Sequence, residues 1–597
     1  MKKFGKLLLS VLMAASMVAC SSSNSGDTET GTTQPSTNEQ FDIVIIGAGG
    51  AGLSAAVQAH EKGAENIVVL EKMSFAGGST TMAFGGFNCT TSRFMDEQGK
   101  EENPVDLTAR IMKNGKNLND VRMAAVVAEE TPEVIEWLDG FGSEWGMIRY
   151  SDLHCPTDGT IPGVELVNVL KEQCKEKGIE IRYNSPAVDI LADETGRING
   201  VVVEDKNGQY TIDTSAVILA TGGYETNADM IAEYGNESLK NIHLAPSQGN
   251  MGDGIVMALK HGAALTNMDL IQLSCAVAPF SIQMQLPIKN NGVIFVNKEG
   301  KRFTNEYSAA SSDRRITDDI LAQTDAECYG VYSDEIYQEF MAIEEKDFFD
   351  EYRMTGIDNS GTVIKADTLD QLAEKMGVPA EALKETVANL KTDGFENEAV
   401  VEKAGTYAEG PYYAILLTPG VMDTLGGVVA DTTARVLRED GSIIAGLYAA
   451  GEVIGNTQGA YYSVGLGEAA VFGRVAARNA IQYINDRGGL TEHVVVEREN
   501  NTNTTEEAAK GEFTDGTFTG EGKGNNGPIK VEVVVEGGNI TSITVTEQVE
   551  TPNIYAGVEE QFIPEIIKTQ NLDIDAVSGA TNSSNGVRTA VKAALGK

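Results

Sequence analysis

The sequence predicts an α/β protein in which a large Rossmann-type domain is followed by a small α+β domain. Three observations lead to this prediction. A glycine-rich turn joins an apolar strand to a helix near the start of the folded region, strand and helix patterns alternate through most of the chain, and short alternating strands return near its end. The 597 residues exceed what one hydrophobic core usually organises, so two or three domains are expected.

The overall charge argues against one class of partner. The formal net charge is −41, whereas binding to nucleic acid needs clustered Lys and Arg. We therefore expect no nucleic-acid partner. The composition, with 42% hydrophobic and 22% charged residues, is that of a folded globular protein rather than of a fibre or a disordered chain.

The first 20 residues, MKKFGKLLLSVLMAASMVAC, combine a basic start, a short apolar run and a cysteine. They predict a secretory signal, because the apolar run is too short for a membrane span. The end of this segment resembles a bacterial lipoprotein signal, which implies acylation of Cys20; plain secretion is the alternative. Residues 21–40 are polar and predict a disordered tether. We expect an extracytoplasmic protein held at the cell membrane by a lipid anchor.

The other five cysteines show no pattern of a disulfide framework or a metal site. Their number is odd, and neither CxxC nor CxxCH occurs. The sequence therefore predicts no zinc site, no attached c-type haem and no metal. These cysteines are Cys89, Cys155, Cys174, Cys275 and Cys328.

A glycine-rich turn lies between a predicted buried strand, residues 43–46, and a predicted helix, residues 53–60. Gly47, Gly49 and Gly52 have the GxGxxG spacing of a dinucleotide-binding turn. The first glycine allows the tight turn, the second lets backbone N–H groups approach a pyrophosphate, and the third allows close packing of helix on strand.

An acidic residue completes this motif. Residues 67–70 predict a second strand, and Glu71 follows it at the spacing from the glycines that the motif requires. A carboxylate here accepts hydrogen bonds from ribose hydroxyls. The motif alone leaves NAD and FAD open.

Further elements follow in order. Residues 216–220 predict another strand, which enters Thr221-Gly222-Gly223. The composition becomes polar over residues 487–510, which predicts a linker. The last part, residues 511–597, predicts alternating strands with a hairpin turn at Gly537-Gly538 and a terminal helix from near Val587.

Several different short blocks that contain glycine follow one another along the chain. They are GGSTTMAFGGFN (77–88), ATGGY (220–224), GDG (252–254), GKRFTNE (300–306), EGPYYAILLTPGV (409–421), TLGGV (424–428) and GLYAAGEVIG (446–455). In this order they resemble the soluble fumarate reductase and flavocytochrome c family, which includes urocanate reductases. The resemblance covers residues 40–485.

The resemblance implies an architecture. A Rossmann-type FAD-binding domain would comprise residues 41–279 and 406–486. An inserted α+β capping domain, residues 280–405, would close over the flavin and leave the substrate between cap and flavin.

The same resemblance implies non-covalent FAD as the cofactor. The positions that match FAD contacts in the family are Ala51, Glu71, Ser79, Thr80, Gly85, Gly86, Ala187, Asp253, Glu452, Gly465 and Leu466.

The segment DAVSGATNSS, residues 575–584, reads by itself as a hydroxyl-rich turn before a helix. It resembles the signature of the FMN-binding domain, in which a hydroxyl two residues beyond SGAT carries FMN through a phosphoester. That position is Ser583, with Ser584 as the neighbouring alternative. The resemblance implies a covalent FMN-binding domain over residues 511–597 and a separate flavin transferase that installs the FMN.

Two flavins in one exported chain predict a path of electrons from a donor through FMN and FAD to a small organic acceptor. A second GxGxxG for a nicotinamide does not occur. We therefore expect a membrane donor, either quinone-linked or an extracellular electron-transfer flavoprotein.

The substrate positions depart from the dicarboxylate-reducing members of the family. Those members bind their substrate with histidines, a Thr-Glu pair and arginines. The loop GAYYSVGLG is shorter than theirs and places Tyr461 and Tyr462 where an arginine would hold a carboxylate. The other matching positions are Ser274, Gln285, Leu286, Lys289, Met422 and Asp423.

The expected proton donor is also displaced. The family places an arginine eight residues beyond Arg302, where this chain has Ala310, and the nearby Arg314 and Arg315 lie in an extension of the segment. The candidate proton donors are therefore Tyr462, Tyr461, Arg314 and Arg315. A surface ion pair is the alternative for the two arginines, and packing under the FAD for the two tyrosines.

These replacements predict a substrate with less charge than a dicarboxylate. Two buried negative charges need paired donors, and few cations remain at these positions. We expect a reductase of an enoate other than fumarate. The alternatives are reduction of a sulfoxide, reduction of fumarate or urocanate despite the altered site, a dehydrogenase working in the oxidising direction, and a non-catalytic flavin electron carrier.

Overall fold

The computed structural model of the chain describes the following residues: 39–83, 85–149, 152–235, 239, 248–277, 282–283, 292–306, 315–341, 363–395, 397–491, 513–524, 527–550, 555, 557–574, 576–577 and 580–597.

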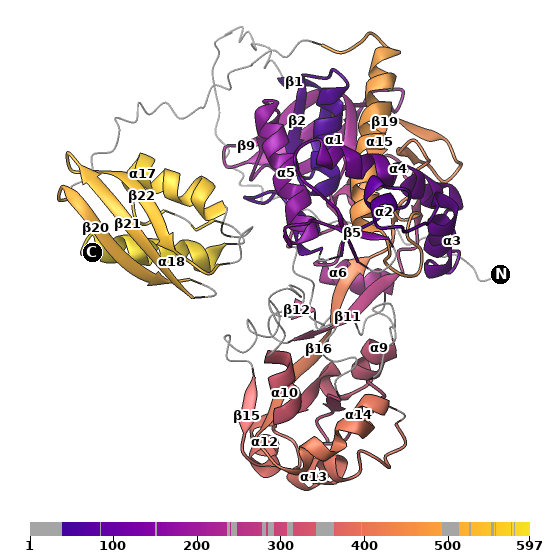
Figure 1. Cartoon of the computed structure of the whole chain (residues 1–597). Helices are drawn as coiled ribbons and strands as arrows, with labels where there is room; N and C mark the ends of the chain where they lie inside the picture. The colour runs from indigo at the N-terminus through magenta and orange to yellow at the C-terminus, as the bar shows by residue number, and fades with distance from the viewer. Residues whose placement is uncertain are drawn as a thin grey trace, which may run out of the picture. The chain divides into compact units, whose positions relative to one another are not determined.

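The first sheet is built around parallel strands, in the order β18-β19-β9-β1-β2-β6. Figure 1 labels β1, β2, β9 and β19 of this sheet. β1 pairs in parallel with β2 and β9. Its apolar residues are buried, as is typical of a strand in a parallel sheet that is covered on both faces. A hairpin of β7 and β8 extends it beside β9. The strands are β1 (Glu39–Ile46), β2 (Ile67–Leu70), β6 (Glu180–Arg182), β7 (Ala187–Ala192), β8 (Ile198–Asp205), β9 (Gly208–Leu219), β18 (Arg435–Leu437) and β19 (Ile443–Ala449).

Helices of this domain bring distant parts of the chain together. α1 (Gly50–Glu61) packs against α15 (Gly465–Asn485) so closely that a side chain at Gly473 of α15 would collide with the carbonyl oxygen of Ala51 in α1. The other main helices are α3 (Pro104–Asn114), α4 (Val121–Asp139), α5 (Pro162–Glu176) and α7 (Asp253–Lys260). The predicted strands at 43–46, 67–70 and 216–220 and the predicted helix at 53–60 are confirmed to within a few residues.

The second sheet has the strand order β12-β11-β16-β14-β13, with β15 also pairing with β16. Its longest strand, β16, pairs with β14 and β15 near its start and with β11 towards its end. The strands are β11 (Ile271–Val277), β12 (Ile282–Gln283), β13 (Ile294–Val296), β14 (Cys328–Ser333), β15 (Ile364–Ala366) and β16 (Tyr412–Thr424). The helices are α9 (Arg315–Leu321), α10 (Asp334–Met341), α12 (Leu369–Met376), α13 (Ala380–Ala388) and α14 (Glu398–Lys403).

The C-terminal part is a sheet with helices. β20 (Gly516–Lys523), β21 (Pro528–Glu536) and β22 (Asn539–Glu547) form an antiparallel sheet, on which α18 (Thr581–Ala594) packs, and α17 (Ile563–Thr569) lies against β22. The predicted turn at Gly537-Gly538 is confirmed, and both glycines have positive φ, 60° and 80°.

The predicted start of the last helix is wrong. α18 begins at Thr581 rather than near Val587, so the hydroxyl-rich residues before Val587 lie inside its first turns. Thr, Asn and Ser favour turns, but they are also at home at the beginning of a helix, and the sequence pattern did not separate the two cases.

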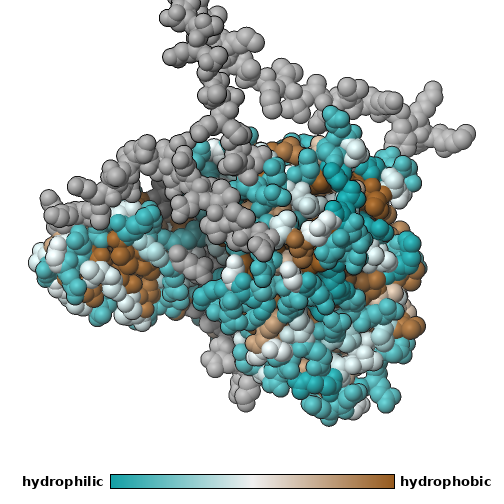
Figure 2. All heavy atoms as spheres, turned by 90° about the horizontal axis from the view of Figure 1, so that it is seen from above, coloured by the Kyte–Doolittle hydropathy of each residue, from teal (hydrophilic) through white to brown (hydrophobic). Residues whose placement is uncertain are grey.

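Within the described residues, the buried hydrophobic side chains form three cores. One joins residues 41–273 to residues 421–484, one lies within residues 293–417, and one lies within residues 529–594. The face in Figure 2 carries mostly hydrophilic residues with small hydrophobic groups between them, in keeping with the high net charge. None of the helices in this described set combines the length and the apolar character needed to cross a membrane.

Candidate functional site

The glycine turn has the shape that a dinucleotide requires. Gly47 has φ +106°, and a side chain there would collide with the carbonyl oxygen of Ala220; a side chain at Gly52 would collide with the carbonyl oxygen of Gly47. Gly49 is the N-cap residue of α1 and has no side chain that could cap the helix, and among the first N–H groups of α1 that of Gly50 donates to Thr80 Oγ1. The N-terminus of α1 is therefore shaped to receive a pyrophosphate.

Glu71 is fixed beside this turn. Its two carboxylate oxygens accept hydrogen bonds from the backbone N–H groups of Ala48 (2.8 Å) and Met73 (2.7 Å). Burial raises the pKa of Glu71, while these hydrogen bonds and Lys72 oppose the shift. The Lys72 ammonium pairs with Asp253, the first residue of α7, at 2.6 Å. Lys72 thus follows one residue predicted to contact FAD, Glu71, in the sequence and forms an ion pair with another, Asp253.

Asn250 links further predicted FAD contacts. Its amide nitrogen lies 3.1 Å from Ser79 Oγ, 3.2 Å from Glu452 Oε2 and 2.7 Å from Glu225 Oε1. Thr80 Oγ1 accepts a hydrogen bond from Gly50 N at 3.0 Å. Sequence reasoning missed Asn250, although it stands just before the GDG block.

The remaining predicted FAD contacts are small or buried residues. Gly86 approaches the carbonyl oxygen of His154 too closely for a side chain, whereas Gly85 has open space. A Cβ at Gly451, next to Glu452, would lie 3.0 Å from Ala51 Cβ. Ala187 and Leu466 are buried, and Leu466 follows Gly465, the first residue of α15. The collision-prone glycines and the donors and acceptors around them fit bound FAD.

Three carboxyl groups meet next to these residues. Glu225 follows β9, Asp423 lies near the end of β16, and Glu452 lies in a short 3-10 helix, Gly451–Val453. One oxygen from each lies within 4.8 Å of the others. We call these residues the acid triad. Gly223 lies against it, since a Cβ there would be 2.5 Å from Glu452 Oε1.

The acid triad is buried and its charges repel. Glu225 is 1% exposed, Asp423 is 8% exposed, and Glu452 is half-buried. Burial raises the pKa of Glu225 and of Asp423 well above the ordinary range of a carboxyl group, and the charge of Glu452 raises both further. The sequence had singled out Asp423 and Glu452 but not Glu225, which directly follows the ATGGY block.

The two predicted tyrosines have different partners. The backbone N–H of Tyr462 donates to Gln272 Oε1 at 2.8 Å, and Gln272 pairs with Asp423 across β11 and β16. Desolvation and the nearby charges of Asp423 and Glu452 raise the pKa of the Tyr462 phenol. The ring of Tyr461 instead lies under the exposed Lys116, with the ammonium 4.6 Å from the ring centroid.

A further buried acid lies near Tyr462. Glu468, in the first turn of α15, accepts a hydrogen bond from Gln458 Nε2 at 2.6 Å. Burial raises its pKa to about 8. Met422 precedes Asp423 in β16, and its sulfur accepts from Gln272 Nε2 at 3.7 Å. Tyr462, Met422 and Asp423 are thus joined through Gln272.

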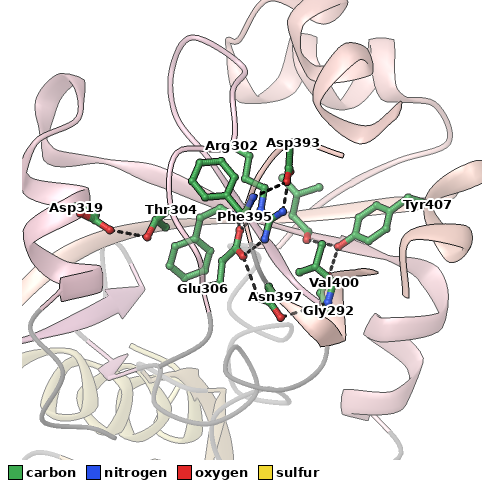
Figure 3. Close-up of polar contacts among 12 residues, drawn as sticks. Gly292, Arg302, Thr304, Glu306, Asp319, Asp393, Phe395, Asn397, Val400 and Tyr407 are labelled. Carbon is green, nitrogen blue, oxygen red and sulfur yellow. Dashed lines mark hydrogen bonds and ion pairs between the residues drawn. The ribbon is translucent and has the colours of Figure 1, made fainter. Parts of the chain in front are cut away.

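The GKRFTNE block forms a buried anchor (Figure 3). Arg302 Nε and Nη2 donate to Glu306 at 2.8 and 2.6 Å, and Arg302 Nη1 donates to Asp393 at 2.7 Å. Glu306 also accepts from Phe295 N at 2.9 Å and from Asn397 Nδ2 at 3.1 Å. This block therefore holds the start of the segment in which the family's proton donor is expected.

Some predicted residues are not described. Arg315 begins α9, and Ser274 lies in β11, but neither side chain is described. Cys20, Gln285, Leu286, Lys289, Ala310 and Arg314 lie outside the described residues.

The C-terminal part has its own candidate flavin site. A side chain at Gly520 or Gly522 of β20 would collide with the backbone of α18, so these glycines let the helix lie directly on the strand. Ser583 Oγ forms a short hydrogen bond with the Glu550 carboxylate, and Ser584 Oγ accepts from Val577 N at 3.1 Å. Both serines are buried. The described residues provide no side-chain cap for α18, which fits a phosphate group at its N-terminus.

Comparison with known families gives two matches. The FAD binding domain model matches residues 42–467, and the FMN-binding domain model matches residues 524–596.

Relatives of known activity match the larger part of the chain. Fumarate reductase (cytochrome) of Shewanella frigidimarina is 32% identical over 463 residues, which cover 75% of this chain and 78% of the relative. Urocanate reductase of Eggerthella lenta is 31% identical over 465 residues, which cover 74% of each chain. The solved structure of the open conformation of a flavocytochrome c3 fumarate reductase superposes with a TM-score of 0.67 at 29% identity, over 74% of this chain and 78% of that one.

Proposed function

The chain belongs to the FAD-dependent family of fumarate reductases and related oxidoreductases and carries an FMN-binding domain as well, and from this premise we propose that it reduces the C=C bond of a small enoate other than fumarate. FAD, when bound, supplies a hydride, and FMN supplies electrons that it accepts singly. The residues that would hold FAD are those of the glycine turn, together with Glu71, Asn250 and Glu452.

The observation that carries this proposal is the charge of the site. Two members of the acid triad, Asp423 and Glu452, stand at positions where the family has a substrate and a flavin contact, and Glu225 lies beside them. None of the ion pairs within the described residues involves these three carboxyl groups. Lys116 lies over the ring of Tyr461, but its side chain is exposed. A dicarboxylate would meet acids in place of counter-charges, whereas a monocarboxylate or a neutral enoate would be repelled less.

Tyr462 is the proton donor in this proposal. Its phenol stays protonated because its pKa is raised, and a neutral phenol can protonate the carbanion that follows hydride addition. Tyr461 is assigned a positioning role, because its ring is engaged by Lys116. Arg314 and Arg315 are the alternative donors.

We propose further that the protein is exported. The support is the sequence of residues 1–40, with acylation at Cys20 as its anchor. The electron donor is then a membrane component, quinone-linked or an extracellular electron-transfer flavoprotein. A flavin transferase attaches the FMN at Ser583.

Stopped-flow reoxidation tests the acceptor class. Protein loaded with both flavins and reduced by dithionite is mixed without oxygen with aliphatic and aromatic monocarboxylic enoates, fumarate and a sulfoxide. We expect fast reoxidation by at least one monocarboxylic enoate and slow reoxidation by fumarate. Fastest reoxidation by fumarate contradicts the proposal, reoxidation by the sulfoxide alone indicates another chemistry, and no reoxidation indicates an electron carrier.

A further inference from the structure

The loop that carries the two tyrosines is closed by one side chain. Gln458 comes directly before the loop GAYYSVGLG, and its Oε1 accepts hydrogen bonds from the backbone N–H groups of Ser463 (2.8 Å) and Val464 (3.4 Å). Tyr461 and Tyr462 lie between these two ends of the loop. The Gln458 side chain therefore fixes how the backbone turns through both tyrosines.

The Gln458 side chain is itself held in one orientation. Its Nε2 donates to Glu468 Oε2 at 2.6 Å. Because a backbone N–H can only donate, the amide oxygen must face the loop and the amide nitrogen must face Glu468. Gln458 is 4% exposed and Glu468 is 1% exposed, so neither group can exchange this hydrogen bond for one with water without cost. We call Gln458 and Glu468 the loop staple.

Other contacts hold the same loop to different elements. Ala460 N donates to Gly115 O at the end of α3, at 3.1 Å, and Tyr462 N donates to Gln272 Oε1 in β11, at 2.8 Å. Gly459 lies so close to the end of α3 that a Cβ there would be 2.6 Å from Gly115 O. The loop staple adds the connection to α15, which contains Glu468.

The connection to α15 bears on Tyr462 in particular. A side chain at Gly465, the first residue of α15, would collide with Tyr462 Oη, so the phenol lies directly against the start of this helix. Gly465 follows the two residues whose N–H groups Gln458 accepts. Releasing these N–H groups would let the phenol and the start of α15 move apart.

We propose that Gln458 and Glu468 are positioning residues for the reduction, because they keep the phenol of Tyr462 against the start of α15, in the place from which it protonates the acceptor. This inference rests on the proposed function, in which Tyr462 is the proton donor. Proton transfer requires a donor within hydrogen-bonding reach, so a displaced phenol slows the chemical step even when flavin and acceptor are bound.

Hydrogen–deuterium exchange tests the loop staple without turnover. Protein loaded with both flavins is compared with its Gln458→Ala variant. We expect the backbone N–H groups of Ser463 and Val464 to exchange about 10-fold faster in the variant, because they lose their acceptor. Gln482→Ala is the matched control, since Gln482 donates to Asp486 at 2.7 Å at the other end of the same helix, where both residues are exposed. Unchanged exchange in Gln458→Ala overturns the proposal.

The second readout separates kcat from KM in the reduction of the best acceptor. We expect Gln458→Ala to lose up to about 100-fold in kcat with little change in KM, the loss that a misplacement of about 1 Å can cause. Flavin content and a far-ultraviolet circular dichroism spectrum establish that the variant is folded. A rise in KM with an unchanged kcat would mean that the staple holds the acceptor rather than the proton donor, and it overturns the proposal.

The third readout exchanges the amide and the carboxyl group between the two positions. Gln458→Glu alone places two carboxyl groups face to face, which can share one proton at low pH but repel each other once both are ionised. Its kcat should therefore fall, relative to wild type, as the pH rises. Adding Glu468→Gln restores an amide donor opposite a carboxylate and should recover kcat at high pH. A double variant no better than Gln458→Glu overturns the proposal.

This exchange has two further advantages. Asp423 and Glu452, the other acids that act on Tyr462, are the same in all the variants, so a difference between their pH profiles belongs to the loop staple. The substitutions also keep the size of both side chains, so they decide the matter if Gln458→Ala does not fold.

The results separate this inference from the function on which it rests. If wild type is reoxidised by an enoate and every staple variant keeps the wild-type kcat, only this inference fails. If no acceptor reoxidises wild type, the proposed function fails, and the role of the loop staple in the reduction fails with it.

Discussion

Arg302 and Glu306 face each other in a buried ion pair in which two guanidinium nitrogens meet two carboxylate oxygens, at 2.8 and 2.6 Å. Their side chains are 2% and 0% exposed. Both residues belong to the GKRFTNE block, residues 300–306. Its geometry is a two-point contact that a lysine could not reproduce.

Removing one partner of this pair should destabilise the cap. Glu306→Gln leaves the buried Arg302 guanidinium with Asp393 as its remaining carboxylate partner. We expect a loss of about 3–5 kcal/mol in the free energy of unfolding of the part of the chain built on the core within residues 293–417. Urea unfolding followed by fluorescence measures it. Lys175→Ala, which removes the exposed pair with Glu172, is the control and should change stability by less than about 1 kcal/mol. Equal effects of the two substitutions would contradict the assignment.

Gly52→Ala should abolish FAD binding while FMN is retained. The new methyl group would collide with the carbonyl oxygen of Gly47 and push α1 away from the turn that receives the pyrophosphate. FAD released by denaturation and covalent FMN can be quantified separately in one sample. Gly405→Ala is the control, because a Cβ there meets no atom within 4 Å. Full FAD content in Gly52→Ala would argue against the cradle.

Tyr462→Phe and Tyr461→Phe form a matched pair of substitutions in adjacent residues. We expect Tyr462→Phe to slow acceptor reduction by about 100-fold or more, since it removes the proton donor. Tyr461→Phe keeps the ring that Lys116 covers and should change the rate little. The rate of reoxidation by the best acceptor measures both. The reverse order of effects would move the donor to Tyr461, and two unchanged rates would favour Arg314 or Arg315.

Covalent FMN should be found on Ser583. The Glu550 carboxylate accepts the hydrogen bond of this hydroxyl and can take its proton as the phosphoester forms. After coexpression with a flavin transferase, mass spectrometry of the C-terminal peptide should show FMN that is lost in Ser583→Ala and kept in Ser584→Ala. FMN found on Thr581, the first residue of α18, or on Ser584 would contradict this prediction.

Glu468 should make the protein less stable as the pH rises. Its pKa is about 8 in the folded state and 4.5 in the reference state, so the folded state binds the proton more tightly. The stabilisation is complete below pH 4.5 and is lost as the pH rises through about 8. Glu468→Gln should flatten this part of the curve of urea midpoint against pH. An unchanged curve would show that Glu468 is ionised in the folded protein.

The sequence predicted local features well. The first strands, the turn glycines and the hairpin at Gly537-Gly538 depend on neighbouring residues, and each is found where its pattern placed it. The acid triad could not be recognised in this way. Glu225, Asp423 and Glu452 come from distant parts of the chain and meet only because β16, the turn after β9 and the start of a short helix converge.

The sequence also could not predict the different surroundings of the two tyrosines. Tyr461 and Tyr462 are adjacent and chemically identical in the sequence. Their partners, Lys116 and Gln272, are set by how other segments pack against the loop. A motif can therefore mark a loop as part of a site without saying which of its side chains faces the chemistry.

Strand β16 limits how this protein can be re-engineered. A single run of backbone from Tyr412 to Thr424 pairs with β14 and β15 of the second sheet at one end and carries Asp423 at the other. A cap taken from another reductase would therefore have to be joined inside a continuous strand, where a shift by one residue exchanges its two faces. The second sheet and the acid triad are consequently inherited together in such chimeras, rather than as interchangeable modules.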